Sequence, residues 1–153
     1  MRFLELKIPP PVMALLLALG AWWLARVTHT RAEPDLLRLV LAVALVLLGA
    51  AYDVSGLLAF RRARTTINPM KPGASSAMVT GGVYRITRNP MYVGLVLLLC
   101  GCSVYLGSPW AWLAPLAFVA YVTRLQIVPE ERVLTRLFGA DYVAYCAKVR
   151  RWL

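Results

Sequence analysis

Residues 88–132 read RNPMYVGLVLLLCGCSVYLGSPWAWLAPLAFVAYVTRLQIVPEER. The uncharged part, residues 91–123, would form a helix of about 50 Å at about 1.5 Å per residue, too long for a membrane hydrocarbon core of about 30 Å. We therefore expect a break at Gly107-Ser108-Pro109, because glycine relaxes the backbone and proline cannot continue the hydrogen bonding of the preceding helix. The stretch is predicted to be a membrane hairpin of two helices, 91–106 and 110–128.

The composition of the whole chain also favours a membrane protein. Hydrophobic residues make up 60% of the 153 residues and charged residues 16%, whereas soluble proteins average about 45–50% and about 25%. Two apolar segments precede the hairpin. We therefore predict one all-α membrane domain, 1–153, with four transmembrane helices at about 9–25, 39–60, 91–106 and 110–128. We interpret the first segment as an uncleaved helix rather than a signal peptide, because three further spans follow it.

Lysines and arginines are distributed unevenly between the predicted spans. Fourteen of the 17 fall in the N-terminus, the middle connector and the tail, whereas three fall at the other ends of the helices. Flanking positive charge favours the cytoplasmic side, so both termini and the connector are predicted to be cytoplasmic, as in a multi-pass protein of a bacterial inner membrane. The net charge of +10 is explained by attraction to anionic lipid headgroups, and no nucleic-acid partner is needed.

The middle connector, residues 61–89, is the longest polar segment. Its Asn-Pro, Pro-Gly, Ser-Ser and Gly-Gly pairs indicate a loop. Long loops are either functional or disordered, and we favour a functional loop because Met78, Val79, Val83 and Tyr84 provide apolar anchors that a disordered linker lacks. The connector is expected to lie over the helix ends as a lid.

Both ends of the predicted hairpin carry residues with two possible roles. Asn89 and Pro90 suit the cap and first turn of a helix, but an exposed helix start beside the Arg88 guanidinium also suits a carboxylate ligand. Glu130 and Glu131 suit the first turn of a helix, where negative charge interacts favourably with the helix dipole, but they are also predicted to face the same side of the membrane as Arg88. The tail that follows has the pattern of an amphipathic interfacial helix interrupted at Gly139.

Other polar residues within or near the spans have simpler interpretations. Asp53 lies in an otherwise apolar span and is either hydrogen-bonded within the bundle or part of an acceptor channel. Cys100 and Cys102 point to different faces of one helix, so the cysteines are interpreted as small apolar residues rather than as a disulfide framework. His29 is predicted in a loop on the opposite side of the membrane, away from any reaction. The sequence predicts no metal site.

In order and spacing, residues 65–151 resemble the superfamily of isoprenylcysteine carboxyl methyltransferases and phospholipid methyltransferases. The matching elements are Thr80-Gly81-Gly82-Val83-Tyr84-Arg85, Arg88-Asn89-Pro90-Met91-Tyr92-x-Gly94, Glu130-Glu131 and Leu137-Phe138-Gly139-x-x-Tyr142-x-x-Tyr145-x-x-x-Val149-x-Arg151. The resemblance implies a methyltransferase that binds S-adenosylmethionine between the connector, the hairpin ends and the tail, with a lipophilic acceptor arriving from the lipid bilayer.

Site residues follow from the resemblance by position. The residues expected beside the cofactor are Tyr84, Arg88, Asn89, Pro90, Tyr92, Gly94, Glu130, Glu131, Tyr142, Tyr145 and Arg151, and those expected to take part in catalysis are Arg88, Glu130 and Glu131. Family members that methylate prenylcysteine commonly have histidine at the position of Asn89 and proline at that of Val83. The acceptor is therefore left open between an isoprenylcysteine-like carboxylate, which is already an anion, and an amine or thiol amphiphile, for which a glutamate would act as base.

Two other functions fit the sequence. A membrane reductase that uses NADPH would share the layout of a charged tail over apolar helices, and cofactor binding distinguishes it from a methyltransferase. A non-catalytic lipid-binding protein would need only the transmembrane helices and the basic residues that flank them. Substitution of Glu130 should leave the behaviour of such a protein intact. The oligomeric state is not predicted.

Overall fold

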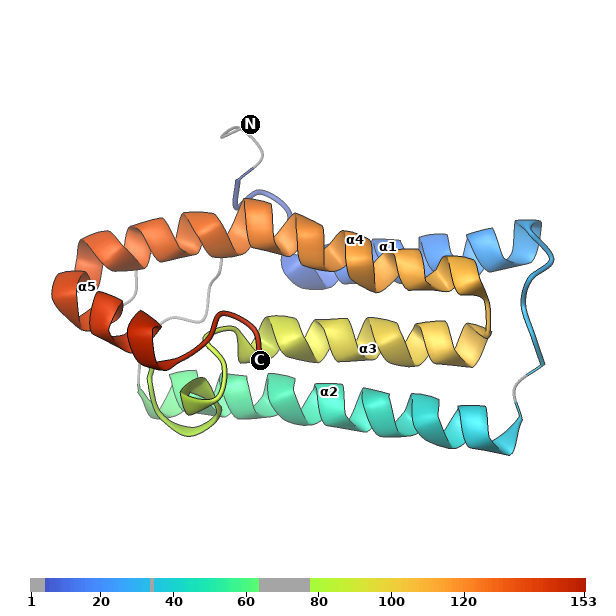
Figure 1. Ribbon diagram of the computed structural model, residues 1–153, viewed down its shortest axis with the longest axis horizontal. Helices are drawn as coiled ribbons and strands as arrows, with labels where there is room; N and C mark the ends of the chain where they lie inside the picture. Colours follow the sequence, from blue (N-terminus) through green and yellow to red (C-terminus); the bar gives the residue numbers. More distant parts are fainter. Residues whose placement is uncertain (1–4, 34, 64–77) are drawn as a thin grey trace.

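The computed structural model describes residues 5–33, 35–63 and 78–153. Within them the regular elements are all helical, and a bridge between Thr87 and Arg150 is isolated. Four helices lie side by side, and a fifth extends beyond one end of the bundle and bends back (Figure 1). The α-helices are α1 (Pro10–Val27), α2 (Leu36–Arg62), α3 (Pro90–Leu106), α4 (Leu113–Val122) and α5 (Val128–Lys148); the short elements are η3 (Gly82–Arg85), η4 (Pro109–Trp112) and the π-helix η5 (Thr123–Ile127).

The lengths and apolar character of these helices fit a multi-pass membrane protein. Three helical stretches in the described part of the chain are long and apolar enough to cross a membrane: α1, α2 and the continuous stretch Pro109–Lys148 of 40 residues. In the last stretch, the apolar part ends at Val128. The fourth helix, α3, is apolar but shorter, with 17 residues.

The predicted break in the hairpin is confirmed. Helix α3 ends at Leu106, and Gly107 adopts a left-handed conformation (φ 63°) in which its N–H bonds the carbonyls of Ser103 and Val104. This C-terminal cap favours glycine, because a Cβ is strained there. Ser103 Oγ also donates to the carbonyl of Ala111, 2.9 Å away, and so joins the two arms of the hairpin.

The second arm continues into the tail along one helical path. Pro129 lies in the first turn of α5, and η5 connects α4 to α5 without a turn. Proline has no N–H for the carbonyl four residues earlier. That carbonyl, Leu125 O, instead accepts a bond of 3.0 Å from the N–H of Leu6. The N-terminal segment thus supplies the donor that Pro129 lacks.

The predicted interruption at Gly139 is also confirmed. Gly139 has φ 50° and ψ −124°, which are not helical, and α5 changes direction there. Figure 1 shows the last part of α5 turned back so that the C-terminus lies beside the start of α3. The reversal places the tail over the residues that are expected to form the site.

Glycines allow α2 and α3 to approach closely. A Cβ on Gly94 would lie 2.8 Å from the carbonyl oxygen of Gly49 and would also meet the Asp53 carboxylate, and a Cβ on Gly101 would lie 3.0 Å from the carbonyl of Ala42. Small residues at such an interface let membrane helices pack by their backbones. Asp53 therefore lies within the contact between the two helices, against Gly94.

Replacing Gly94 by alanine should destabilise the protein by about 1–3 kcal/mol, because the added methyl group overpacks a backbone contact. Gly20→Ala is the matched control, since nothing lies within 4 Å of a Cβ at that exposed position of α1. We expect thermal unfolding in detergent to show a lower midpoint for Gly94→Ala and no decrease for Gly20→Ala. Equal midpoints would contradict the close approach of α2 and α3.

Candidate active site

The tail is attached to the beginning of α3 by backbone contacts. The N–H of Arg88 donates to the carbonyl of Arg150 at 3.0 Å, beside the parallel bridge between Thr87 and Arg150. Thr87 is fully buried, and its hydroxyl donates to the carbonyl of Arg151 at 3.2 Å. These contacts bring residues more than 60 positions apart in the chain to one place.

The Glu131 carboxylate lies between two arginines at this place. Arg88 Nη1 is 3.1 Å from Glu131 Oε1, and Arg151 donates to both carboxylate oxygens, from Nε at 3.0 Å and from Nη2 at 2.7 Å. The second contact has the two-pronged geometry that makes arginine–carboxylate pairs strong and directional. Glu131 therefore connects α5, the start of α3 and the tail.

Arg88 has donor capacity beyond this ion pair. Its side chain is 13% exposed, and Nη1 also donates to Cys146 Sγ at 2.6 Å. Its Nε is buried and has no hydrogen-bond partner in the part of the chain that the structure describes. A buried donor without a partner is costly, so this nitrogen is available for an acceptor such as a ligand carboxylate.

The second glutamate makes a different contact. The hydroxyl of Tyr92, on the first turn of α3, donates to Glu130 Oε1 at 2.6 Å. Glu130 follows the apolar part of the hairpin, and burial raises the pKa of its carboxyl to about 7. The hydrogen bond from Tyr92 lowers this pKa, whereas the neighbouring Glu131 charge raises it slightly. Glu130 is therefore close to half-ionised near neutral pH.

The prediction that the Asn89 side chain caps α3 is wrong. Asn89 is the N-cap residue of α3, but its side chain accepts no bond from the helix. Instead its Nδ2 donates to the carbonyl of Arg151 at 2.8 Å. Docking of the tail places this carbonyl within reach of both the Thr87 hydroxyl and the Asn89 side chain, and a carbonyl oxygen can accept from two donors. Pro90 occupies the first turn of α3, as expected.

Arg88, Glu130, Glu131 and Arg151 form what we call the charged cluster. Three tyrosines surround it. Tyr145 donates from its hydroxyl to the carbonyl of Tyr84 at 2.7 Å, and the ring of Tyr84 contacts that of Phe60 edge to face, 5.6 Å between centroids. Tyr142 is buried, and its ring centre is 6.3 Å from that of Tyr145. Burial raises the pKa of the Tyr142 hydroxyl, with further contributions from Cys146 and Glu131. The aromatic rings thus connect η3 with the tail.

Most of the predicted residues therefore come together at the junction of η3, the α3 start and the tail. Gly94 faces α2 instead, and its place beside a cofactor stays a prediction. His29 lies in the connection after α1, which bonds to Leu106 and Ser108 at the C-terminal end of α3, whereas the charged cluster lies at the start of α3. Two residues of the junction were not predicted: Thr87, and Cys146. The spacing of Cys146 four residues after Tyr142, on the same helical face, is the signal that would have indicated it.

A sequence profile of the family described as phospholipid methyltransferase matches residues 37–141 of this chain. The chain belongs to that family. The match includes α2, the hairpin and both glutamates, so the charged cluster lies within the part that defines the membership, except for its tail residues.

Two relatives in plants are named as methyltransferases. Protein-S-isoprenylcysteine O-methyltransferase B of Arabidopsis thaliana is 30% identical over 108 residues, 69% of this chain and 53% of that protein. Protein-S-isoprenylcysteine O-methyltransferase A of the same plant is 37% identical over 75 residues, 47% of this chain and 36% of that protein. An uncharacterized protein of Haemophilus influenzae is 41% identical over 63 residues, 41% of this chain and all of that protein. The matched region spans about half or less of each plant enzyme, and no solved structure matches the chain.

Proposed function

We propose that this chain transfers a methyl group from S-adenosylmethionine to an amphiphilic acceptor at one face of the membrane. The observation that carries the proposal is the cluster of Arg88, Glu130, Glu131 and Arg151, which three separate segments bring together at one end of an apolar bundle. Charged side chains at the end of a membrane bundle, in a member of a methyltransferase family, are best explained as a polar cofactor site beside a lipid.

The proposed topology has four spans, with α3 as the third despite its shorter length. Both termini and the middle connector would face the cytoplasm of a bacterial cell, since they carry 14 of the 17 basic residues. The connector residues 64–77 lie outside the described part of the chain. The whole chain is proposed to be a single domain, with the cofactor-binding part at about 65–151 and the first two helices supporting it.

The residues of the cluster fit the chemical groups of the cofactor. S-adenosylmethionine supplies a methyl group on a sulfonium centre and also carries an ammonium and a carboxylate. Arg88 Nε, buried and without a partner among the described residues, would donate to the carboxylate. Glu130 would attract a cationic group, and the rings of Tyr84 and Tyr92 offer faces for cation–π contact.

The protein's main tasks in such a reaction are alignment and exclusion of water. The ion pairs of Glu131 hold the tail across the start of α3, and the Tyr145–Tyr84 hydrogen bond closes the tail onto η3. The Asn89 side chain donates to the carbonyl of Arg151 and so also holds the tail against the start of α3. An acceptor carboxylate needs no base, so ionised Glu130 would act by its charge; an amine acceptor would need Glu130 to remove a proton.

Calorimetry on the purified protein in lipid nanodiscs tests this function. We expect saturable binding of S-adenosylmethionine and S-adenosylhomocysteine, no binding of NADPH, and loss of adenosyl-ligand binding in Glu130→Ala. Glu5→Ala is the matched control, because Glu5 pairs with Arg132 outside the cluster. Binding of NADPH alone would favour a reductase, and absence of any binding by a folded protein would refute the methyltransferase.

A further inference from the structure

The π-helix η5 directly precedes the two glutamates of the charged cluster. The N–H of Val128 donates to the carbonyl of Thr123, five residues earlier, so this turn holds one residue more than an α-helical turn. An α-helix rotates by about 100° per residue. If the turn were α-helical, α5 would therefore be rotated by about 100° relative to α4, and Pro129 would take the direction in which Glu130 now points. The extra residue thus determines which side chain faces the start of α3.

The segment before α1 binds this turn through one carbonyl oxygen. The carbonyl of Ile8 accepts from two side chains, Gln126 Nε2 at 2.9 Å and the hydroxyl of Tyr121 at 3.2 Å. The two donors are five residues apart, which corresponds to about 140° around an α-helix. A π-helix, whose bonds join residues i and i+5, places such residues nearly on the same side. The Ile8 carbonyl therefore fits both donors when the backbone between them contains the extra residue.

A backbone hydrogen bond attaches the same segment to the same turn. The N–H of Leu6 donates to the carbonyl of Leu125 at 3.0 Å, which Pro129 leaves without its α-helical donor. Leu6 has a φ of 57°, a left-handed conformation that is costly for a residue other than glycine and persists only where the surrounding structure holds it. The neighbouring ion pair of Glu5 with the exposed Arg132 contributes little.

Gln126 is completely buried, although only part of its amide is hydrogen-bonded. Its Oε1 has no partner in the part of the chain that the structure describes. Burying such a group is costly, so apolar packing does not explain a glutamine at this position. The bond from Nε2 to the carbonyl of Ile8 is the contact that explains it.

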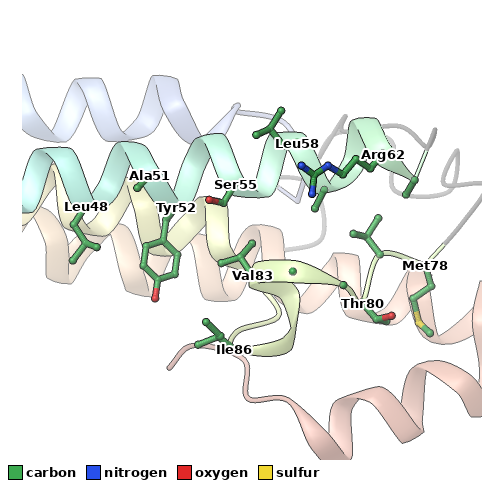
Figure 2. Close-up of a pocket in the computed structure, with 15 residues that line it drawn as sticks. Leu48, Ala51, Tyr52, Ser55, Leu58, Arg62, Met78, Thr80, Val83 and Ile86 are labelled. Atoms are coloured by element: carbon green, nitrogen blue, oxygen red, sulfur yellow. The ribbon is translucent and has the colours of Figure 1, made fainter.

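The direction of Glu130 decides which groups surround its carboxylate. Tyr92 donates to it, Glu131 is its neighbour in α5, and Tyr84 interacts with it electrostatically. Tyr84 belongs to η3, which lies along a cavity of about 930 Å³ beside α2 (Figure 2). A rotation of α5 would turn the Glu130 carboxylate away from both tyrosines.

We propose that residues 6–8 keep η5 in its π-helical form. In this arrangement Gln126 is a positioning residue, because it binds the N-terminal segment and so directs Glu130 towards Tyr92. The consequence for cofactor binding rests on the proposed function, in which the Glu130 carboxylate attracts a cationic group of S-adenosylmethionine. The direction of Glu130 itself does not depend on the reaction. The segment before α1 thus acts on the site through η5.

The test measures the titration of Glu130 in the ligand-free protein in lipid nanodiscs. Infrared difference spectra follow the carbonyl stretch of its protonated carboxyl, assigned as the band that Glu130→Gln lacks. In the wild-type background, Tyr92→Phe should raise the midpoint by about one pH unit, as expected for loss of a hydrogen bond to a charged group. Gln126→Met has a side chain of the same length without the N–H donor. In that background Tyr92→Phe should change the midpoint by less than about 0.3 unit, because the two groups are no longer in contact.

Two controls separate this role from a general effect on packing. Arg124→Met introduces the same side chain at an exposed position of η5, so Tyr92→Phe should keep its wild-type effect there. Leu6→Pro removes the N–H and cannot adopt a φ of 57°, whereas Leu6→Gly keeps the N–H and allows this φ. The effect of Tyr92→Phe on the Glu130 titration should be lost in Leu6→Pro and kept in Leu6→Gly.

Binding of S-adenosylmethionine is measured separately at pH 8. We expect Gln126→Met to weaken it by at least about tenfold, as in Glu130→Gln, and the double variant to bind no more weakly than Glu130→Gln. Gel filtration and thermal unfolding establish that each variant is folded, and Leu6→Pro decides the question if Gln126→Met does not fold. A wild-type effect of Tyr92→Phe in either folded background would overturn the proposal. The titration needs no cofactor, so failure of the methyltransferase function and failure of the positioning role are distinguishable.

Discussion

Glu131→Ala is expected to detach the tail from the start of α3 and to weaken S-adenosylhomocysteine binding by more than about a hundredfold. The carboxylate compensates Arg88 and Arg151, and the side chains of Glu131 and Arg88 are 19% and 13% exposed. Removing one partner of a largely buried ion pair costs about 3–5 kcal/mol, and we expect the lower value because the Arg151 side chain is 39% exposed. Calorimetry gives the affinity, and the rate of tryptic cleavage after Arg150 and Arg151 reports release of the tail.

Arg132→Ala is the control for this result. It removes the ion pair with Glu5, at 2.9 Å, in which the Arg132 side chain is 44% exposed. Exposed pairs contribute about 0–1 kcal/mol, so tail cleavage and ligand affinity should stay near the wild-type values. If Glu131→Ala behaved like Arg132→Ala, the three-residue ion network would not be what holds the site closed.

Backbone features of the fold were predictable because they depend on local chemistry. The 33 uncharged residues at 91–123 exceed one membrane thickness, and Gly107 and Pro109 are residues that end one helix and begin another. Gly139 similarly interrupts α5. These positions could be assigned without knowing which other segment lies nearby.

The contacts that assemble the site depend on distant partners and could not be derived in this way. Arg151 and Glu131 meet only because α5 reverses at Gly139. Asn89 was expected to cap α3, yet the tail carbonyl of Arg151 takes its side chain. Gly94 matched a motif residue, but its environment is set by Gly49 and Asp53 of α2. The positions of residues in the motifs thus predicted which residues come together, whereas tertiary packing determined their hydrogen bonds and ion pairs.

Glu130→Gln is expected to weaken S-adenosylmethionine binding by at least about tenfold at pH 8 and to remove most of its pH dependence. Burial raises the pKa of the Glu130 carboxyl to about 7, so in the ligand-free protein this group is mainly protonated at pH 6 and mainly ionised at pH 8. A cationic ligand favours the ionised form. Wild-type affinity should therefore rise by up to about tenfold from pH 6 to pH 8 and then level off. Calorimetric titrations across this range measure the profile.

The two adenosyl ligands identify which cation Glu130 serves. S-adenosylmethionine has a sulfonium and an ammonium, whereas S-adenosylhomocysteine has only the ammonium. Loss of affinity in Glu130→Gln for the first ligand alone would place the carboxylate beside the sulfonium, and equal losses would place it beside the ammonium. Unchanged affinity for both would contradict a role of Glu130 in cofactor binding.

Tyr92→Phe provides a variant in which Glu130 is retained but its ionisation is altered. The Tyr92 hydroxyl donates to Glu130 Oε1 at 2.6 Å, and this bond stabilises the carboxylate and lowers its pKa. Without the bond the pKa should rise, so the midpoint of the affinity profile should move to higher pH while the affinity at alkaline pH approaches that of the wild type. Glu130→Gln has no such midpoint to move. A profile with an unchanged midpoint in Tyr92→Phe would show that the titrating group is not the carboxylate that Tyr92 contacts.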